Sequence, residues 1–142
     1  MRPNVIALAS ILALLCCAQM FAADTPKKEE KKDDNPLAKF DEEKLIDPGY
    51  CFNEFAKAVA SKDAKVAAAF LIEIPKHLQK LDLKKPADQE TFIKALAKFS
   101  GAQADSSQKM HGMAEVKYTD KDGKAQSQRM ELRAGVWKIT GL

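Results

Sequence analysis

The sequence predicts an α+β domain in which N-terminal helices pack on one face of a C-terminal antiparallel meander of three or more strands. Apolar residues recur at helical spacing in the first half of the folded region, roughly between residues 48 and 100. From about Met110 the pattern changes to an alternation of apolar and polar residues, which is typical of half-buried strands. The helices therefore supply the apolar cover that one face of such a meander needs.

The first 23 residues are typical of a secretory signal peptide. A basic start at Arg2 is followed by a short apolar run from Val5 to about Cys17, and then by small residues before Asp24. A bilayer span needs about 20 apolar residues, so this run is too short for one. We expect an exported protein, periplasmic or secreted, with no stable membrane span after signal removal. An uncleaved anchor and a lipid-anchored cysteine are the alternatives.

Residues 24–36 are interpreted as a charged flexible linker, because they contain no large apolar side chain. A docking tail is the alternative. Residues 37–142 then form a single α+β domain that is long enough for one apolar core. Two of the three cysteines lie in the signal, so the domain keeps only Cys51 and no internal disulfide. A net charge of +3 is too small to favour nucleic acid or an anionic membrane as a partner.

Three helices are expected in the first half of the domain, each begun or ended by a residue suited to that place. Asp47 and Pro48 begin the first, and Asp63 begins the second, which Pro75 ends. The third extends from about residue 88 to residue 100 and stops at a glycine. Their apolar faces consist of Phe52, Phe55, Ala56, Val59, Ala60, Val66, Ala69, Phe70, Phe92, Ile93, Leu96 and Phe99.

Three strands are expected at residues 111–119, 125–133 and 136–141. Their register follows from the requirement that the turns deliver every apolar face to the same side of the sheet. A two-residue loop at Ala134-Gly135 satisfies it by pairing Leu132 with Trp137. A three-residue loop at residues 121–123, with its glycine left-handed, satisfies it by pairing Ala114 with Met130 and Val116 with Gln128.

The opposite face of the predicted sheet gives an independent test of this register. The same pairings place Glu115 across from Arg129, and Glu131 across from Lys138. Opposite charges facing each other on a solvated sheet each contribute a few tenths of a kcal/mol, roughly. One face is therefore charged and the other apolar. On the apolar face we expect Trp137 to be a core anchor rather than a ligand-stacking residue.

Two segments, KDAKVAAAF at the start of the second helix and LRAGVWKI at the end of the chain, carry a resemblance to a known family. Together with the order of elements, they resemble small exported bacterial domains of the nuclear-transport-factor-2-like superfamily, over roughly residues 47–142. The resemblance implies a cone-shaped fold with a cavity between bent sheet and helices, and in many members a dimer through the outer sheet face. The strand that such a fold expects between the second and third helices is not evident here.

Five side chains on the inward face are the expected lining of a small apolar pocket between helices and sheet. They are Tyr118, Gln126, Gln128, Met130 and Trp137. No inward strand position carries an acid or a histidine, which the base of an isomerase or dehydratase would require. We therefore expect a non-catalytic binding or interaction domain without a cofactor. Its partner would be a small apolar ligand or a protein, with a homodimer among the options.

Two alternatives stay open at this point. A small isomerase- or hydratase-like enzyme of the same fold would need Asp82, Asp88 or Asp105 to reach the cavity from a loop. A structural or assembly protein would act through its surface, or through an intermolecular disulfide at Cys51.

Metal and nucleic-acid sites are not expected. His77 and His111 are far apart in the sequence and have no third ligand beside them. Met110, Met113 and Met130 are not spaced as a thioether site, so we expect them to fill the core or a sheet edge. The chain has no glycine-rich phosphate loop, and its lysines are not interleaved with aromatic residues.

Overall fold

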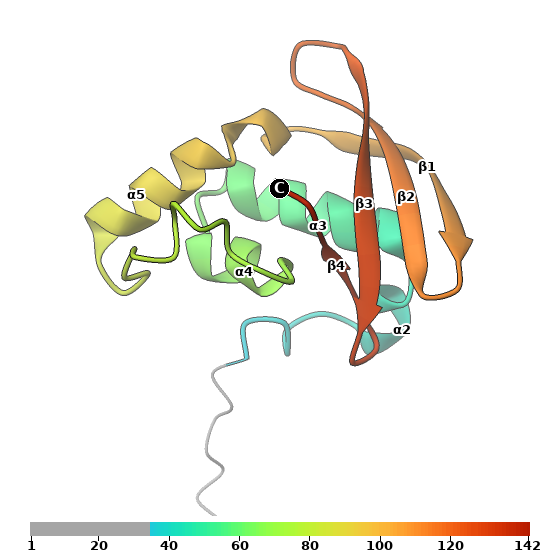
Figure 1. The fold of residues 1–142 in the computed structure, drawn as a ribbon, viewed down its shortest axis with the longest axis horizontal. Coiled ribbons are helices and arrows are strands. Elements are labelled where there is room, and N and C mark those ends of the chain that lie inside the picture. Colours follow the sequence, from blue (N-terminus) through green and yellow to red (C-terminus); the bar gives the residue numbers. More distant parts are fainter. Residues whose placement is uncertain (1–34) are drawn as a thin grey trace, which may run out of the picture. The chain divides into compact units, whose positions relative to one another are not determined.

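The computed structural model describes residues 35–142, which form one compact unit with the predicted α+β arrangement (Figure 1). The predicted signal peptide at residues 1–23 lies outside the described residues, as does the predicted linker up to residue 34. The elements in chain order are α2 (Glu42–Leu45), α3 (Pro48–Ala60), α4 (Ala64–Ala69), α5 (Pro86–Ala95), the 3₁₀ helix η1 (Ala97–Phe99), β1 (Gln103–Met110), β2 (Met113–Thr119), β3 (Ala125–Arg133) and β4 (Val136–Ile139).

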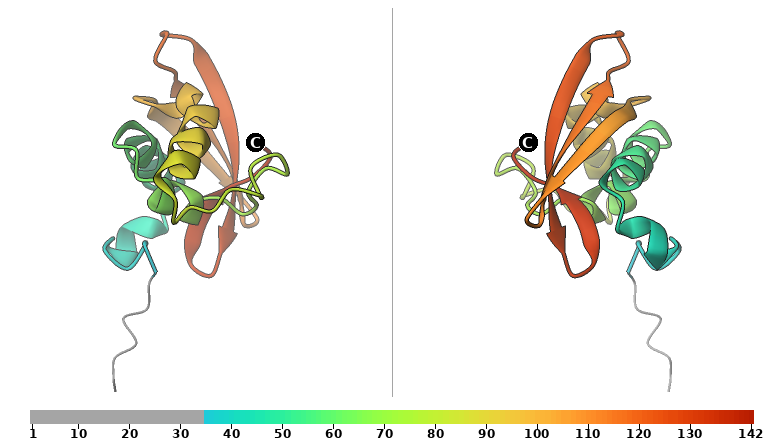
Figure 2. Two further views of the ribbon diagram at one scale, coloured as in Figure 1. Left: turned by 90° about the vertical axis from the view of Figure 1, so that its left-hand side faces the viewer. Right: turned by 90° about the vertical axis from the view of Figure 1, so that its right-hand side faces the viewer.

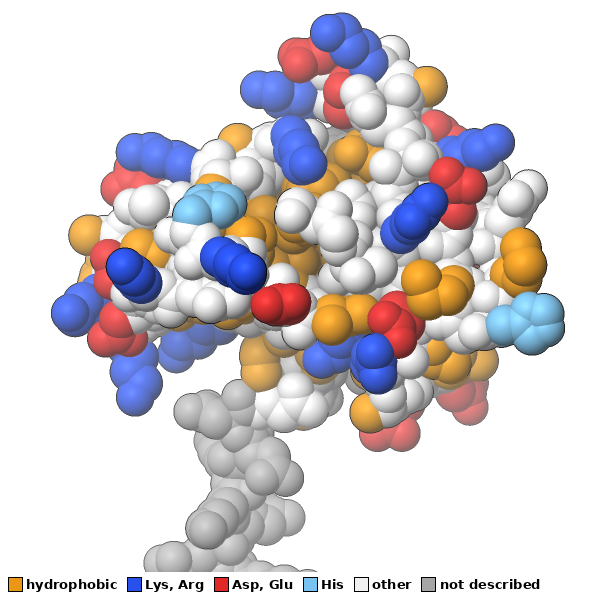
Figure 3. Space-filling model, in the orientation of Figure 1, with side chains coloured by type: hydrophobic (Ala, Val, Ile, Leu, Met, Phe, Trp, Pro, Cys, Tyr) orange, Lys and Arg blue, Asp and Glu red, His pale blue; other side chains and the backbone are white. Residues whose placement is uncertain are grey.

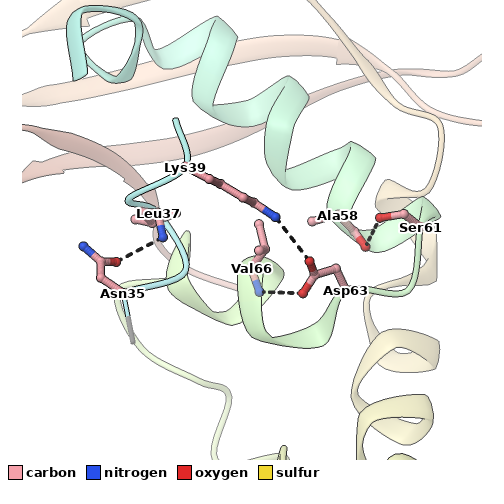
Figure 4. A network of polar contacts seen from close by, with 7 residues as sticks. All are labelled: Asn35, Leu37, Lys39, Ala58, Ser61, Asp63 and Val66. Carbon is pink, nitrogen blue, oxygen red and sulfur yellow. Dashed lines mark hydrogen bonds and ion pairs between the residues drawn. The ribbon is translucent and has the colours of Figure 1, made fainter. Parts of the chain in front are cut away.

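The helix starts follow the capping residues named in the sequence. The Asp47 carboxylate accepts from the backbone N–H groups of Gly49 and Tyr50, at 2.8 and 3.3 Å, and Pro48 is the first residue of α3. Asp63 accepts from the Val66 N–H at 3.1 Å and so begins α4 (Figure 4). These bonds satisfy backbone donors that a helix start would otherwise leave unpaired.

The second helix ends at Ala69, well before the expected stop at Pro75. The chain leaves the helix there because the next residues bind the edge of the sheet beside β4. The Ile139 N–H donates to the Phe70 carbonyl at 2.7 Å, and the Ile72 N–H donates to the Ile139 carbonyl at 3.0 Å. Leu71 thereby forms a single parallel bridge with β4. Tertiary pairing has overridden a good helical pattern.

The segment before α2 packs beside α4, and it includes Asn35 and Pro36, which were predicted to belong to the linker. Asn35 Oδ1 accepts from the Leu37 N–H at 3.0 Å, and Lys39 Nζ lies 3.4 Å from Asp63 Oδ2 (Figure 4). The ring of Phe40 meets that of Phe70 edge-on, with centroids 5.6 Å apart. The described fold therefore includes Asn35 and the residues after it, with the short helix α2.

The sheet has four strands in the order β1-β2-β3-β4, all antiparallel, and its register confirms the predicted pairings. Leu132 pairs with Trp137, and Ala114 pairs with Met130. Gly123 is left-handed at φ 77°, as the three-residue loop requires. At the two-residue loop, Ala134 is left-handed with φ 50° and Gly135 with φ 79°, the conformation of a type I′ turn.

The first strand, β1, was not predicted. Its sequence, QADSSQKM, is polar, and every position except Ala104 is exposed, so it carries no alternating pattern. It pairs with β2 across a two-residue turn at His111 and Gly112, where φ is 47° and 79°. The predicted strand start at residue 111 is therefore wrong, and His111 lies in this turn rather than on the outward face of a strand.

The helices lie on one face of the sheet (Figure 2), and α3 crosses it and contacts both outer strands, β1 and β4. Aromatic rings from three elements meet between them. Phe99 contacts Phe55 at 5.2 Å between centroids and Phe52 at 6.2 Å, while Tyr118 of β2 lies 4.6 Å from Phe52. These rings are buried, and they couple the helical layer to the inner face of the sheet.

Trp137 is a core residue, as expected, with 3% of its surface exposed. Its indole Nε1 donates to the Ile46 carbonyl at 2.9 Å, which satisfies the polar end of a buried ring. Leu132, expected inside beside it, is 40% exposed, because it lies where β3 extends toward the turn at the end of the sheet.

On the charged face the predicted neighbours are in register, since Glu115 pairs with Arg129 and Glu131 with Lys138. The ion pair formed in this part of the described chain is a different one. Glu131 binds Arg133, two residues along the same strand, rather than Lys138 across the sheet. Exposed pairs of this kind contribute about 0–1 kcal/mol, so burial of the apolar face is the main stabilisation of this strand register.

Replacing Trp137 by alanine is expected to lower the free energy of unfolding by about 3–5 kcal/mol, because a buried aromatic ring is lost and a cavity remains. Trp137→Phe keeps one aromatic ring but loses the second ring and the indole donor, so it should cost less than Trp137→Ala and more than the roughly 1 kcal/mol of a single hydrogen bond. Urea unfolding followed by circular dichroism measures both, since Trp137 is the only tryptophan and fluorescence would be lost. Equal stability of Trp137→Ala and the parent would contradict the structure.

Replacing Ala134 by glycine is expected to raise the free energy of unfolding by about 1 kcal/mol, because alanine pays a steric penalty at this left-handed position. Ala125→Gly is the matched control. Ala125 is an exposed residue of β3, where glycine should instead destabilise by about 0.5–1 kcal/mol. Thermal unfolding of the two variants should move in opposite directions, and a shift in the same direction would argue against the type I′ turn.

Candidate functional site

Three of the five predicted pocket residues belong to the core. Met130 and Trp137 are buried on the inner face of the sheet. Tyr118 is buried against Phe52 and Phe99, and burial, followed by the nearby Asp120 charge, raises the pKa of its phenol. These side chains are brought together by the sheet, and each is packed against neighbours.

The two glutamines of the predicted lining differ in burial. Gln128 is buried, and its Nε2 donates to the Thr140 carbonyl at 2.7 Å and to the Arg129 carbonyl at 3.2 Å. Gln126 is exposed and donates to Asp120 Oδ2 at 3.4 Å near the β2–β3 loop. Gln128 therefore holds the C-terminal residues to β3, and Gln126 stabilises the loop.

The three acids that an enzyme of this fold would need are engaged locally instead. Asp88 accepts from the Asp82 N–H at 2.9 Å, and Asp82 accepts from the Lys84 N–H at 3.0 Å, which orders the approach to α5. Asp105 accepts from the Thr119 hydroxyl at 2.9 Å on the exposed part of the sheet. Within residues 35–142, no group of three or more His, Cys, Asp or Glu side chains is placed to hold a metal ion.

Cys51 is fully buried on α3. Its thiol donates to the Leu45 carbonyl at 3.2 Å. Burial raises the pKa of the thiol from 9.0 to about 11, although the backbone N–H of Trp137 acts in the opposite direction. A protonated, inaccessible thiol is neither a nucleophile nor a partner for an intermolecular disulfide.

A group of exposed apolar side chains at one end of the sheet is the feature that sequence reasoning missed. We call it the exposed apolar end and define it as Ile46, Met110, Met113 and Leu132, which are 58%, 70%, 42% and 40% exposed. Ile46 lies in the α2–α3 connection, and Met110 and Met113 flank the β1–β2 turn on the outer face of the sheet. Leu132 lies on the inner face, near the end of β3. Figure 3 shows several hydrophobic side chains at the end of the sheet away from the β2–β3 loop, with charged side chains between them.

Hydrogen bonds hold the parts of the exposed apolar end in place. The Ile46 carbonyl accepts from both Trp137 Nε1 and Lys109 Nζ, at 2.9 and 3.1 Å. The Leu132 N–H donates to the Gly112 carbonyl at 2.8 Å, which joins the β1–β2 turn to β3. The patch is therefore carried by a rigid framework rather than by a loop tip.

A hollow of about 570 Å³ adjoins this patch on β1, β2 and β3. Both methionines line it, together with charged and polar side chains. The full lining is Gln108, Lys109, Met110, Met113, Ala114, Glu115 and Arg129. Apolar side chains with a charged rim suit a surface that binds another molecule.

No family model, curated protein or solved structure matches the chain. Among the described residues, no helix is both long enough and apolar enough to cross a membrane.

Cys51 is expected to resist alkylation by iodoacetamide at pH 8 unless denaturant is added. The free energy of unfolding should also fall as the pH rises from about 9 to about 11. The unfolded thiol loses its proton from about pH 9, whereas the folded thiol holds it to about pH 11, so the unfolded state binds fewer protons between these two pH values. Urea unfolding at pH 8, 9 and 10 measures the decline, and Cys51→Ala is the control in which this component should vanish. Rapid native alkylation would contradict the burial.

Proposed function

We propose that this chain is an exported, non-catalytic interaction domain, and that it binds a protein partner through the exposed apolar end. The observation that carries the proposal is that Ile46, Met110, Met113 and Leu132 are all exposed at the same end of the sheet, Met110 and Met113 on its outer face and Leu132 on its inner face. Single exposed apolar residues are ordinary on a protein surface, but several at one end of a sheet suit a partner that wraps around that end. The predicted signal peptide at residues 1–23 supports the export part of the proposal.

The filled inner face also favours surface binding over an internal ligand. Buried neighbours or hydrogen bonds engage Tyr118, Gln128, Met130 and Trp137, the residues from which a pocket between helices and sheet would be built. Opening such a pocket would require parting the aromatic contacts between Phe52 and Tyr118. A partner at the exposed apolar end needs no such rearrangement.

A place in the nuclear-transport-factor-2-like superfamily is part of the proposal, as a reduced member. Two features support it: the helices precede the meander, and Leu71 bridges β4 where the resemblance expects a strand between the second and third helices. A dimer through the outer sheet face, as in many members of that superfamily, would bring the charged Glu115 and Arg129 side chains to the interface. Burying them is costly unless they pair, so we place the contact at the apolar end instead.

Site-specific photo-crosslinking in the exporting host tests this proposal. A photo-reactive amino acid at position 132, in the exposed apolar end, is expected to yield a crosslinked protein product. The same residue at position 124 is the matched control, because Lys124 is also solvent-exposed and lies in the loop at the other end of the sheet. The mass of the product distinguishes a second copy of this chain from a different protein.

Adding Leu132→Glu to a chain with the photo-reactive residue at position 46 should abolish the product there, since a charge would be placed in an apolar contact. Circular dichroism would show that this exposed substitution leaves the fold intact. Equal crosslinking at positions 132 and 124, or none at either, would reject the exposed apolar end as a binding surface.

A further inference from the structure

The β1–β2 turn brings together three side chains with soft or borderline donor atoms. Met110 and Met113 are direct cross-strand partners, and His111 lies between them in the two-residue turn. The sequence spacing alone did not indicate a site, because the reversal of the chain at His111 and Gly112 was not foreseen. The turn converts neighbours three positions apart along the chain into a facing pair.

The two thioethers lie on the same face of the sheet, since directly opposed residues of antiparallel strands share a face, with Cβ atoms about 4.5–5.5 Å apart. Methionine has three flexible side-chain bonds, so two such side chains can bring their sulfur atoms to one point. Both are open to solvent, and both line the hollow on β1, β2 and β3. An ion could therefore reach them without disturbing the core.

The charged side chains near this place are of both signs. The Lys109 side chain keeps its positive charge, but it lies on the other face of the sheet, where its ammonium donates to the Ile46 carbonyl at 3.1 Å. Arg129 also borders the hollow, and its charge is opposed by Glu115 directly across the strand pair. Thioether sulfur is a soft ligand and imidazole nitrogen a borderline one, so the set suits a soft monovalent ion better than a hard divalent one.

We propose that Met110, Met113 and His111 form a surface site for a soft monovalent cation, Cu(I) or Ag(I). Thioether ligands select soft ions of this kind, whereas Mg²⁺ and Ca²⁺ prefer oxygen ligands. The two sulfur atoms hold the ion, and the imidazole completes a three-ligand shell. The site depends on the geometry of the turn and does not require the protein contact proposed above.

Silver(I) nitrate in chloride-free buffer is the probe, because Ag(I) mimics Cu(I) without redox chemistry. The protein is purified as its host processes it, so any sulfur groups near the N terminus are common to all variants. Native mass spectrometry should show one silver ion fewer on the Met110→Leu/Met113→Leu double variant than on the parent. Equal silver stoichiometry in the two proteins would overturn the proposal.

Methyl NMR of methionine labelled with ¹³C locates the ion. One equivalent of Ag(I) should shift the methyl signals of Met110 and Met113, while Met130, which is fully buried, serves as the control within the same chain. Zinc(II) at the same concentration should leave the two exposed methyl signals in place. Silver-induced shifts confined to other methionines, or zinc-induced shifts at these two, would contradict a soft-cation site.

His111→Asn tests the third ligand and keeps the turn, because asparagine adopts left-handed φ values readily. Its affinity for Ag(I) should fall by about tenfold or more, because even the loss of a group that only supports a ligand costs about 10–100-fold, and an unchanged affinity would overturn the three-ligand site. The leucine double variant also separates the two proposals, because leucine keeps the apolar surface and removes the sulfur. Silver binding should be lost in it, while crosslinking at position 132 should persist.

Discussion

The hydrogen bond from the Trp137 indole to the Ile46 carbonyl joins the last strand of the domain to the connection between its first two helices. Residues 91 positions apart are thereby fixed to each other inside the core. The same carbonyl receives the Lys109 ammonium from β1, and the neighbouring Leu45 carbonyl receives the Cys51 thiol. The helical layer is held on the sheet at this point, and the exposed apolar end is built around it.

The register of the meander could be predicted because each turn allowed only one arrangement with a consistent apolar face. Gly123 and the Ala134-Gly135 pair left no other choice once Trp137 had to point inward. The strand β1 could not be predicted in the same way, because its polar residues give no period. The early end of α4 was equally hidden, since backbone bonds from Phe70 to Ile139 decide it rather than helix propensity.

The candidate sites show what residue patterns could not predict. The alternation of side chains along each strand correctly placed four residues on the inner face, namely Tyr118, Gln128, Met130 and Trp137. It could not tell whether that face is packed or encloses a cavity. That distinction depends on how closely α3 approaches the sheet. Conversely, the exposed methionines became visible as a pair only when the turn was known, because three residues of separation means little until the chain reverses.

The sheet has two edge strands, β1 and β4, and they differ in how readily a further strand could pair with them. Leu71 covers part of the β4 edge, whereas the β1 edge has no strand beside it within residues 35–142. The register shift between Ala104 and Ser106 makes that open edge irregular. The Ala104 N–H already donates a hydrogen bond to the Asn53 amide oxygen at 2.8 Å. An incoming strand would find neither a regular ladder nor a free donor at this point, so the fold carries its own safeguard against fibrillar stacking.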